Sequence, residues 1–303
     1  MSTGGADAGA QRWDPGSTLA GYAWPAAEPR AALLLQHGFG EYAQRFATAY
    51  SGLIPHLVDL GVSVYAFDAW GHGGSPGRRA VTDLERTTQV HRRARKVLAD
   101  TVDAPLFLLG HSMGGLITAA SVAADPAGVA GVILSAPALR ADIPAPLAWA
   151  MRALAAFAPA AGSGFGRIAP ETLYAGAQTD PVLQHDPQMY RGSLPLLLCA
   201  SGFRLMRDAW EWYPSWTTPV LVLHGGDDRP EVSRAFYERI ASADKTLHVV
   251  PDGRHELLND TAAANTLALL LAWLDERIPQ RRATGGPQAG EEDPRVPDRP
   301  PSA

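Results

Sequence analysis

Ser112 stands between Gly110 and Gly114 in the stretch LFLLGHSMGGLI, at the centre of a G-x-S-x-G pattern. A serine hydroxyl becomes a nucleophile when a neighbouring base takes its proton. Where an apolar strand turns sharply into a helix, the residues two positions on either side of the serine crowd each other unless they lack side chains. The apolar run before the serine and GLITAASVAA after it suit such a turn. A chance match would explain the short pattern but not its flanks.

His255 is the candidate base among the nine histidines. It lies in PDGRHELLND, after the last strand-like run and before the final helical stretch. A triad that runs along the chain as serine, acid and histidine requires a base near the C-terminus. His255 would otherwise be an ordinary surface-loop histidine. His37 and His111 flank the same expected site but lie on turns, where we expect them to orient backbone groups.

Two candidate acids, Asp227 and Asp228, follow the strand-like run in PVLVLHGGDDR, upstream of the base. A carboxylate there could accept the second N–H of the imidazole and stabilise the imidazolium as it forms. Either aspartate could instead cap the helix that begins near Pro230. The residues alone leave the choice between the two aspartates open.

Backbone amides are the candidate groups for binding a developing oxyanion, which preformed loops with free N–H groups stabilise. The amide of Met113 directly follows the serine, and the amide of Phe39 follows His37 and Gly38 in LLLQHGFGEYAQRF. A hydrolase with this type of turn uses these two chain positions. Gly38 and Gly40 could instead be turn residues alone. Such chemistry needs no metal ion and no organic cofactor, and we expect neither.

Six apolar runs must supply the framework that positions these groups. They are AALLLQHG, VSVYAFDAW, PLFLLGHS, VAGVILSAP, PVLVLHGG and TLHVVPDG. Each run is continuous rather than alternating, which favours strands that are covered on both faces. Helical stretches such as 83–100 and 233–243 lie between them, and strand alternating with helix predicts an α/β fold with a mostly parallel sheet.

The 303 residues suffice for one large core with an insertion. The strand–helix alternation covers 13–137 and 201–280, while prolines, alanines and aromatic residues replace it in an insertion at 138–200. The tail 281–303 is rich in proline, glycine and charge, and we predict that it and residues 1–12 are disordered.

Composition argues against several function classes. The formal net charge of −5, without a sustained basic run, offers no electrostatic footprint for nucleic acid. Cys199 is the only cysteine, which fits a reducing compartment, so we expect a cytoplasmic location. The N-terminal residues lack the pattern of a secretory signal. The stretch 143–161 contains Arg152 and three prolines, and 266–274 is too short to span, so we expect no membrane-spanning helix.

The chain resembles the monoacylglycerol lipases and lysophospholipases of the α/β-hydrolase superfamily over residues 19–277. The matching motifs are HGFGEYAQRF, FDAWGHGGSPGRR, LGHSMGG, TDPVLQHDPQMYRG, HGGDDR and SADKTLHVVPDGRHELLND. As a set they are far more specific than the serine pattern alone. The resemblance implies an α/β-hydrolase fold, with helices on both faces of a mostly parallel sheet and a mainly helical lid in the insertion.

The same resemblance implies a role for each site residue. Ser112 becomes the nucleophile, His255 the base and Asp228 the acid, the last because it is the fourth residue of a G-x-x-D motif. Phe39 and Met113 would lend their amides to the oxyanion hole. One departure concerns the acid, because DDRPEVSRAFYERI reaches its helix about three residues sooner than in similar proteins. Further matching positions would shape loops around the site: Glu41, Arg45, Asp68, His72, Ser75 and Arg78.

The activity implied by the resemblance is that of a carboxylic ester hydrolase acting on single-chain acyl esters such as monoacylglycerols or lysophospholipids. The alternatives are a thioesterase or C–C bond hydrolase on the same fold, and a non-catalytic lipid-binding or ligand-binding protein. A helix within 143–161 would be apolar on nearly every side, so it must be buried, line an acyl channel or dip into a membrane surface. The partners expected are therefore a small acyl ester and, through the lid, a membrane surface; no oligomeric state is predicted.

Overall fold

The computed structural model describes residues 9–280, in which eight strands form one sheet. The strands lie in the order β1-β2-β4-β3-β5-β6-β7-β8. Their bounds are β1 Gln11–Trp13, β2 Gly21–Trp24, β3 Ala31–Gln36, β4 Val62–Phe67, β5 Leu106–His111, β6 Val129–Ser135, β7 Val220–Gly225 and β8 Lys245–Val250. β1, β2 and β4 pair antiparallel, and every other neighbouring pair is parallel.

The predicted mostly parallel sheet is therefore confirmed, and the six apolar runs become β3 to β8. All residues of β3, β5 and β7 are buried, as expected for strands covered on both faces. The antiparallel start, β1 and β2, was not predicted. The prediction of disorder for residues 1–12 is wrong at Gln11 and Arg12, because both residues pair with β2. Residues 1–8 and 281–303, where we also predict disorder, lie outside the described residues.

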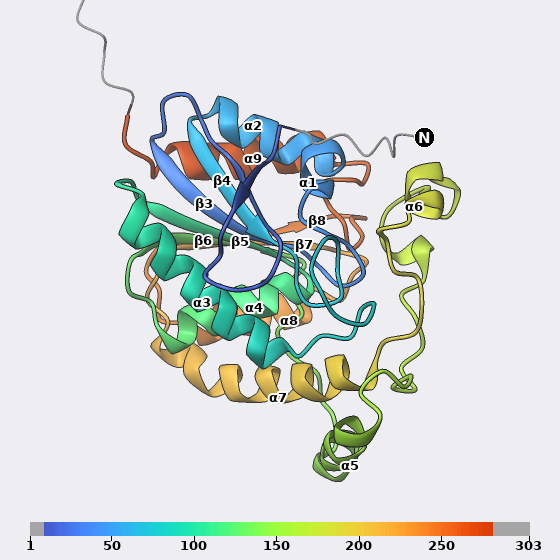
Figure 1. Cartoon of the computed structure of the whole chain (residues 1–303). Helices are drawn as coiled ribbons and strands as arrows, with labels where there is room; N and C mark the ends of the chain where they lie inside the picture. The colour runs from blue at the N-terminus through green and yellow to red at the C-terminus, as the bar shows by residue number, and fades with distance from the viewer. Residues whose placement is uncertain (1–8, 281–303) are drawn as a thin grey trace, which may run out of the picture.

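Helices cover both faces of this sheet (Figure 1). Their bounds are α1 Arg45–Thr48, α2 Leu53–Asp59, α3 Leu84–Thr101, α4 Met113–Ala124, α5 Ala145–Phe157, α6 Pro181–His185, α7 Leu196–Trp212, α8 Glu231–Arg239 and α9 Ala263–Asp275. Short 3-10 turns occur at Tyr50–Gly52, Pro170–Thr172, Ala177–Thr179 and Tyr213–Ser215. α2 and α9 lie on one face, with Leu33 and Leu35 packed beneath them, whereas α3, α4 and α8 cover the other face, where Leu34 is buried.

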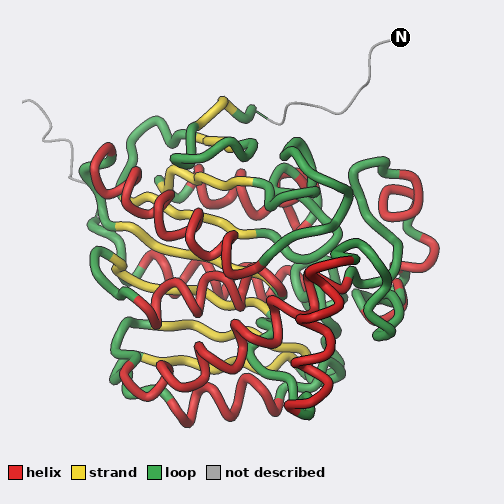
Figure 2. Tube along the Cα trace, turned by 60° about the horizontal axis from the view of Figure 1, so that its bottom comes forward, coloured by secondary structure: helices red, strands yellow, loops and turns green. Residues whose placement is uncertain are grey.

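The residues between β6 and α7 form a separate excursion that includes α5 and α6 (Figure 2). Its loops bond to the segments that follow the parallel strands: Tyr190 donates its N–H to the carbonyl of Gly40, after β3, at 2.7 Å. Glu256, after β8, donates its N–H to the carbonyl of Leu173 at 2.7 Å. The excursion therefore lies at the carboxyl ends of the strands.

The predicted end of the insertion at residue 200 falls inside α7. Leu198 and Leu205 pack into the core that α3 and α4 share, while Cys199 contacts Met151 of α5. One face of α7 thus packs against the core, and another face packs against the insertion. A long helix can do both when it carries two apolar stripes. The folded core resumes at Leu196.

α5 is not packed into the core. Only Met151 and Ala155 are buried, whereas Trp149 is 74% exposed and Phe157 is 89% exposed. Most of the large apolar side chains of this helix are therefore not used for packing against the core. Within residues 9–280, no helix combines the length and the hydropathy that crossing a bilayer requires.

Candidate active site

Ser112 occupies the turn between β5 and α4 in a strained conformation, with φ 53° and ψ −114°. A Cβ atom on Gly110 would lie 2.4 Å from the carbonyl oxygen of Gly114, and one on Gly114 would lie 2.1 Å from the carbonyl oxygen of Gln36. Both glycines are needed because backbone passes where a side chain would begin. The turn therefore presents the serine side chain at the carboxyl edge of the sheet.

Three side chains from separate loops form one hydrogen-bond chain. The Oγ of Ser112 lies 2.7 Å from Nε2 of His255, and Nδ1 of the same ring lies 2.6 Å from Oδ2 of Asp228. The serine follows β5, the aspartate follows β7 and the histidine follows β8. Parallel strands bring these carboxyl-terminal loops to one edge of the sheet, although serine and histidine are 143 residues apart. Such a chain can activate a serine hydroxyl for attack on an electrophilic carbon.

Asp228, not Asp227, faces the histidine. The side chain of Asp228 is 24% exposed, whereas Asp227 is exposed and donates its amide to the carbonyl of Gly253 at 3.0 Å. Arg229, with a φ of 56°, turns the short loop directly into α8. Neither aspartate caps α8, which begins without a side-chain cap.

The pKa values of Asp228 and His255 both shift in the direction that stabilises their hydrogen bond. Burial would raise the pKa of Asp228, but hydrogen bonds from His224 and His255 outweigh it, so that pKa is lowered. Burial would lower the pKa of His255, but Asp228, followed by Glu256 and Glu41, outweighs it, so that pKa is raised. The ionised aspartate keeps a proton on Nδ1, which leaves Nε2 of the neutral ring free to accept the serine proton.

The loop after β3 lies directly beside the serine. A Cβ atom on Gly38 would lie 3.3 Å from Cβ of Ser112. The N–H of Gly38 donates to Oε1 of Glu41 at 2.7 Å, which fixes the loop. Within residues 9–280, neither the amide of Phe39 nor that of Met113 donates to another backbone group outside a helix or strand. Both amides are therefore available to an oxygen that carries negative charge.

A buried ion network joins this loop to the loop that carries the histidine. Arg45 donates to Oε2 of Glu41 at 2.9 Å and to Oε2 of Glu256 at 3.0 Å. Tyr50 donates its O–H to Glu41 at 2.8 Å. The charged side chains are at most 5% exposed. Two carboxylates share one guanidinium, so excess negative charge lies next to His255.

The other two predicted histidines have different partners. Nε2 of His37 accepts the N–H of Ala69 at 3.0 Å, so its Nδ1 donates to the carbonyl of Gly38 at 2.7 Å. His37 therefore orients backbone, as predicted. His111 instead contacts the hydroxyl of Ser135, with 3.4 Å between Nδ1 and Oγ, so the predicted backbone role is wrong for this ring. Its imidazole packs against that of His255, with 5.1 Å between the ring centroids.

The remaining motif residues support loop backbone. Asp68 accepts the N–H groups of Ala43 and Gly74, each at 2.8 Å, and Ser75 donates its O–H to the carbonyl of Asp68 at 2.6 Å. Nδ1 of His72 lies 2.9 Å from the carbonyl of Trp70. Arg78 contributes through its backbone, because its carbonyl oxygen accepts the N–H of Val81 at 3.0 Å.

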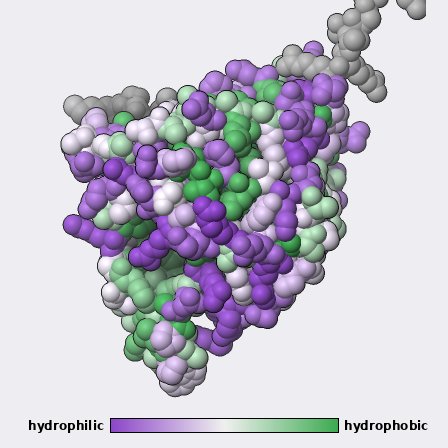
Figure 3. Space-filling view, turned by 180° about the vertical axis from the view of Figure 1, so that it is seen from behind, coloured by the Kyte–Doolittle hydropathy of each residue, from purple (hydrophilic) through white to green (hydrophobic). Residues whose placement is uncertain are grey.

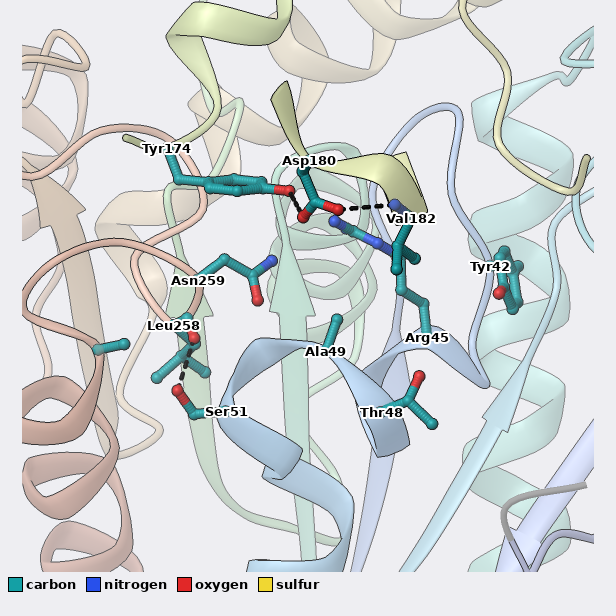
Figure 4. Close-up of a pocket in the computed structure, with 11 residues that line it drawn as sticks. Tyr42, Arg45, Thr48, Ala49, Ser51, Tyr174, Asp180, Val182, Leu258 and Asn259 are labelled. Atoms are coloured by element: carbon teal, nitrogen blue, oxygen red, sulfur yellow. Dashed lines mark hydrogen bonds between the residues drawn. The ribbon is translucent and has the colours of Figure 1, made fainter. Parts of the chain in front are cut away.

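Two cavities are lined in part by residues of the ion network. One, of about 200 Å³, is lined by Phe39, Glu41 and Glu256 and by apolar residues of the insertion. The other, of about 420 Å³, has mixed polar and apolar walls and lies between α1 and the insertion, with Arg45 at its wall (Figure 4). There the hydroxyl of Tyr174 donates to Asp180 at 2.5 Å. Only the first cavity borders the loop beside the serine.

Sequence reasoning missed Glu256 and His224. Each had a local signal, because Glu256 directly follows the candidate base and His224 is the one polar residue in the run PVLVLHGG. Neither signal identifies a partner, because only the tertiary structure brings Arg45 to Glu256 and Asp228 to His224. Among the described residues, no group of three or more histidine, cysteine, aspartate or glutamate side chains is placed to hold a metal ion.

Comparison with known proteins gives a consistent picture. The sequence profile of the serine aminopeptidase S33 family matches residues 27–262. The monoacylglycerol lipase of Mycolicibacterium smegmatis is 33% identical over 261 residues, covering 82% of this chain and 90% of that protein. The monoglyceride lipase of Mus musculus is 29% identical over 266 residues, covering 84% of this chain and 85% of that protein. The solved structure of the Paleococcus ferrophilus monoacylglycerol lipase has a TM-score of 0.75 and 27% identity over 86% of this chain and 99% of that chain.

Removing one charge of the ion network tests its effect on the histidine. We expect Glu256→Gln to lower the pKa of His255, because a nearby negative charge that stabilises the imidazolium is lost. Titration of the ring by NMR would show the midpoint moving to lower pH. The exposed Glu238→Gln is the control and should leave the midpoint unchanged. An unchanged midpoint in Glu256→Gln would contradict the electrostatic role of the network.

Proposed function

Because the chain belongs to the serine aminopeptidase S33 family, we propose that it is a serine hydrolase that cleaves the ester bond of monoacylglycerols. The observation that carries the proposal is the hydrogen-bond chain from Ser112 through His255 to Asp228. The names of the relatives supply the substrate class, since the two similar sequences and the similar structure are monoacylglycerol or monoglyceride lipases.

The geometry suggests the following sequence of proton transfers. Ser112 attacks the ester carbonyl while Nε2 of His255 takes the hydroxyl proton, and the imidazolium then returns a proton to the leaving glycerol oxygen. Asp228 holds the ring in the required tautomer and stabilises its positive charge. Water, deprotonated by the same imidazole, then hydrolyses the acyl-enzyme and restores the serine.

The amides of Phe39 and Met113 would stabilise the oxyanion of the tetrahedral intermediate. Met113 is the first residue of α4, so the positive end of that helix dipole lies at the same point. A single donor of this kind contributes about 10²- to 10³-fold to kcat in other acyl-transfer enzymes. The fixed loop from Gly38 to Glu41 means that little reorganisation accompanies the reaction.

The cavity of about 200 Å³ beside Phe39 supports an ester with one apolar and one polar end. Its walls are mostly apolar, with Ile168, Leu173, Leu183 and Met189 contributed by the insertion. Glu41 and Glu256 contribute carboxylates to the wall, where hydroxyl groups of an alcohol could donate hydrogen bonds. We therefore assign the part of the predicted insertion 138–200 that precedes α7 the role of a lid over the substrate.

The exposed apolar surface of α5 supports peripheral contact between the lid and a membrane. Its large exposed side chains are Leu147, Trp149, Leu154 and Phe157. Figure 3 shows hydrophobic residues on the lobe that α5 forms at the lower edge of the molecule. A helix with such a face binds at the lipid–water boundary. The single cysteine supports a reducing location, and we propose that the enzyme acts in the cytoplasm.

Replacing the nucleophile tests the reaction class. We expect Ser112→Ala to lower kcat for a monoacylglycerol by roughly 10⁴- to 10⁶-fold, because the acyl-enzyme can no longer form. Fatty-acid release from monoacylglycerols of graded chain length, measured beside lysophosphatidylcholine, would give the rate and the preferred head group. A fluorophosphonate probe should label the parent and not the variant. An alanine variant within tenfold of the parent would overturn the mechanism.

Paired asparagine substitutions test the acid. We expect Asp228→Asn to lower kcat by roughly 10³- to 10⁴-fold, because an amide cannot hold the required tautomer. Asp227→Asn is the matched control, one residue away and exposed, and should retain a rate close to that of the parent. Equal losses in the two variants would count against the assignment of Asp228. The measurement is steady-state hydrolysis of p-nitrophenyl butyrate.

Polar substitutions on α5 test the membrane contact. We expect the double variant Trp149→Ser/Phe157→Ser to lose co-sedimentation with phosphatidylcholine vesicles, because the apolar area available for insertion falls. Hydrolysis of a water-soluble short ester should be unaffected. Trp212→Ser, an exposed apolar side chain outside α5, is the control and should sediment as the parent does. Vesicle binding that survives the double substitution would refute the contact.

A further inference from the structure

His224 is a buried imidazole that the proposed reaction does not use. It is the fifth residue of β7, is 3% exposed and lies among apolar neighbours. A buried polar side chain needs partners, because an unpaired polar atom in the interior costs about 1–3 kcal/mol. The partners of His224 are informative, because they belong to the loop of the catalytic acid and to the helix that follows it.

One ring nitrogen of His224 faces two oxygens of the same aspartate. Nε2 lies 2.7 Å from the carbonyl oxygen of Asp228 and 3.3 Å from its carboxylate Oδ2. A carbonyl oxygen and an ionised carboxylate can only accept hydrogen bonds. Nε2 must therefore carry the proton and donate to Asp228.

The other nitrogen is fixed from α8. Nδ1 of His224 lies 2.7 Å from the hydroxyl oxygen of Ser233, which is fully buried. With the proton of the neutral ring on Nε2, Nδ1 accepts the hydroxyl proton of Ser233. The hydroxyl, which can donate or accept, therefore fits the tautomer that the oxygens of Asp228 require.

We propose that His224 is a positioning residue, which holds the carboxylate of Asp228 in the orientation that His255 requires and is itself held by Ser233. The inference rests on the proposed function. Oδ2 of Asp228 lies 2.6 Å from Nδ1 of His255 and 3.3 Å from Nε2 of His224, so both rings face one oxygen, while the N–H of His224 bonds to the carbonyl of the same residue. The bond to the carbonyl also holds the backbone of this residue where Arg229 turns with a positive φ.

Without His224, the carboxylate would lose a buried donor while 24% of its side chain remains exposed to water. It could then rotate toward solvent, and the imidazole of His255 would lose part of its orientation. The hydrogen bond from His224 also contributes to the lowered pKa of Asp228. Because contact with Asp228 raises the pKa of His255, loss of this orientation lowers the pKa of His255 and moves the acid limb of kcat/KM to lower pH.

The test compares three substitutions at this position. Gln places an amide nitrogen near the position of Nε2, Asn places one near Nδ1, and Leu supplies no donor. We expect His224→Leu and His224→Asn to lower kcat for p-nitrophenyl butyrate by roughly 10- to 100-fold, with KM nearly unchanged. His224→Gln should restore most of the rate and the parental pH profile. Ser233→Ala should show a smaller loss of the same kind.

His91→Leu is the matched control, because His91 is also fully buried and also contacts a helix serine, with 3.0 Å between its Nδ1 and Oγ of Ser121. It should lose stability toward urea without moving the acid limb of the pH profile. If His224→Leu does not fold, the inference is tested by comparing kcat and the pH profile of His224→Gln with those of His224→Asn.

Equal kcat and equal pH profiles for Gln and Asn would overturn the inference, as would a parental rate in His224→Leu. Failure of the proposed function itself would give a different set of results. In that case the parent protein would hydrolyse no ester and Ser112 would not react with a fluorophosphonate.

Discussion

The guanidinium of Arg45 between Glu41 and Glu256 is the interaction on which the site depends. Glu41 anchors the loop that contains Phe39 through the N–H of Gly38, and Glu256 directly follows His255, the proposed base. Taking three charges out of water costs several kcal/mol for each ion, and only good geometry offsets that cost. Tyr50, Asn259 and the backbone supply the additional hydrogen bonds. Two loops that are distant in sequence are therefore held in one fixed relation.

The network also has an unequal charge count, which links structure to reactivity. A neutral pair would hold the loops equally well, whereas two carboxylates with one guanidinium leave a negative potential beside the imidazole of His255. That potential adds to the effect of Asp228 in raising the pKa of His255, and in the proposed reaction it would stabilise the imidazolium. On the other side of the ring, His224 and Ser233 extend the hydrogen-bond chain into α8. The reacting groups are thus surrounded by side chains that fix orientation and charge together.

The insertion divides into two parts with different surroundings. Residues near Leu173 and Tyr190 bond to the loops that follow β8 and β3, so they form part of the wall of the site. α5 packs on α7 through Met151 and Ala155 and exposes most of its other apolar side chains. The hydrogen bonds from the insertion to the loops after β8 and β3 therefore do not involve α5.

The sequence by itself determined the local features. Continuous apolar runs predicted β3 to β8, because strands covered on both faces need no polar face. The glycines at 110 and 114 predicted the turn of Ser112, since the crowding that they relieve is a property of a few neighbouring residues. The order of serine, aspartate and histidine along the chain indicated which loops meet, because parallel strands end at one edge. Motif resemblance, rather than spacing, preferred Asp228 to Asp227.

Only the tertiary structure decided which side chains touch across loops. The contact of Asp228 with His255 depends on the turn at Arg229, and the pairing of Arg45 with Glu256 spans 211 residues. The orientation of His224 toward Asp228 depends on the packing of α8 against β7. α5 packs on only part of α7, so the rest of its apolar surface stays exposed. Its composition alone was equally compatible with burial. Periodicity and turn chemistry are local, but partner choice and burial are set by contacts between distant segments.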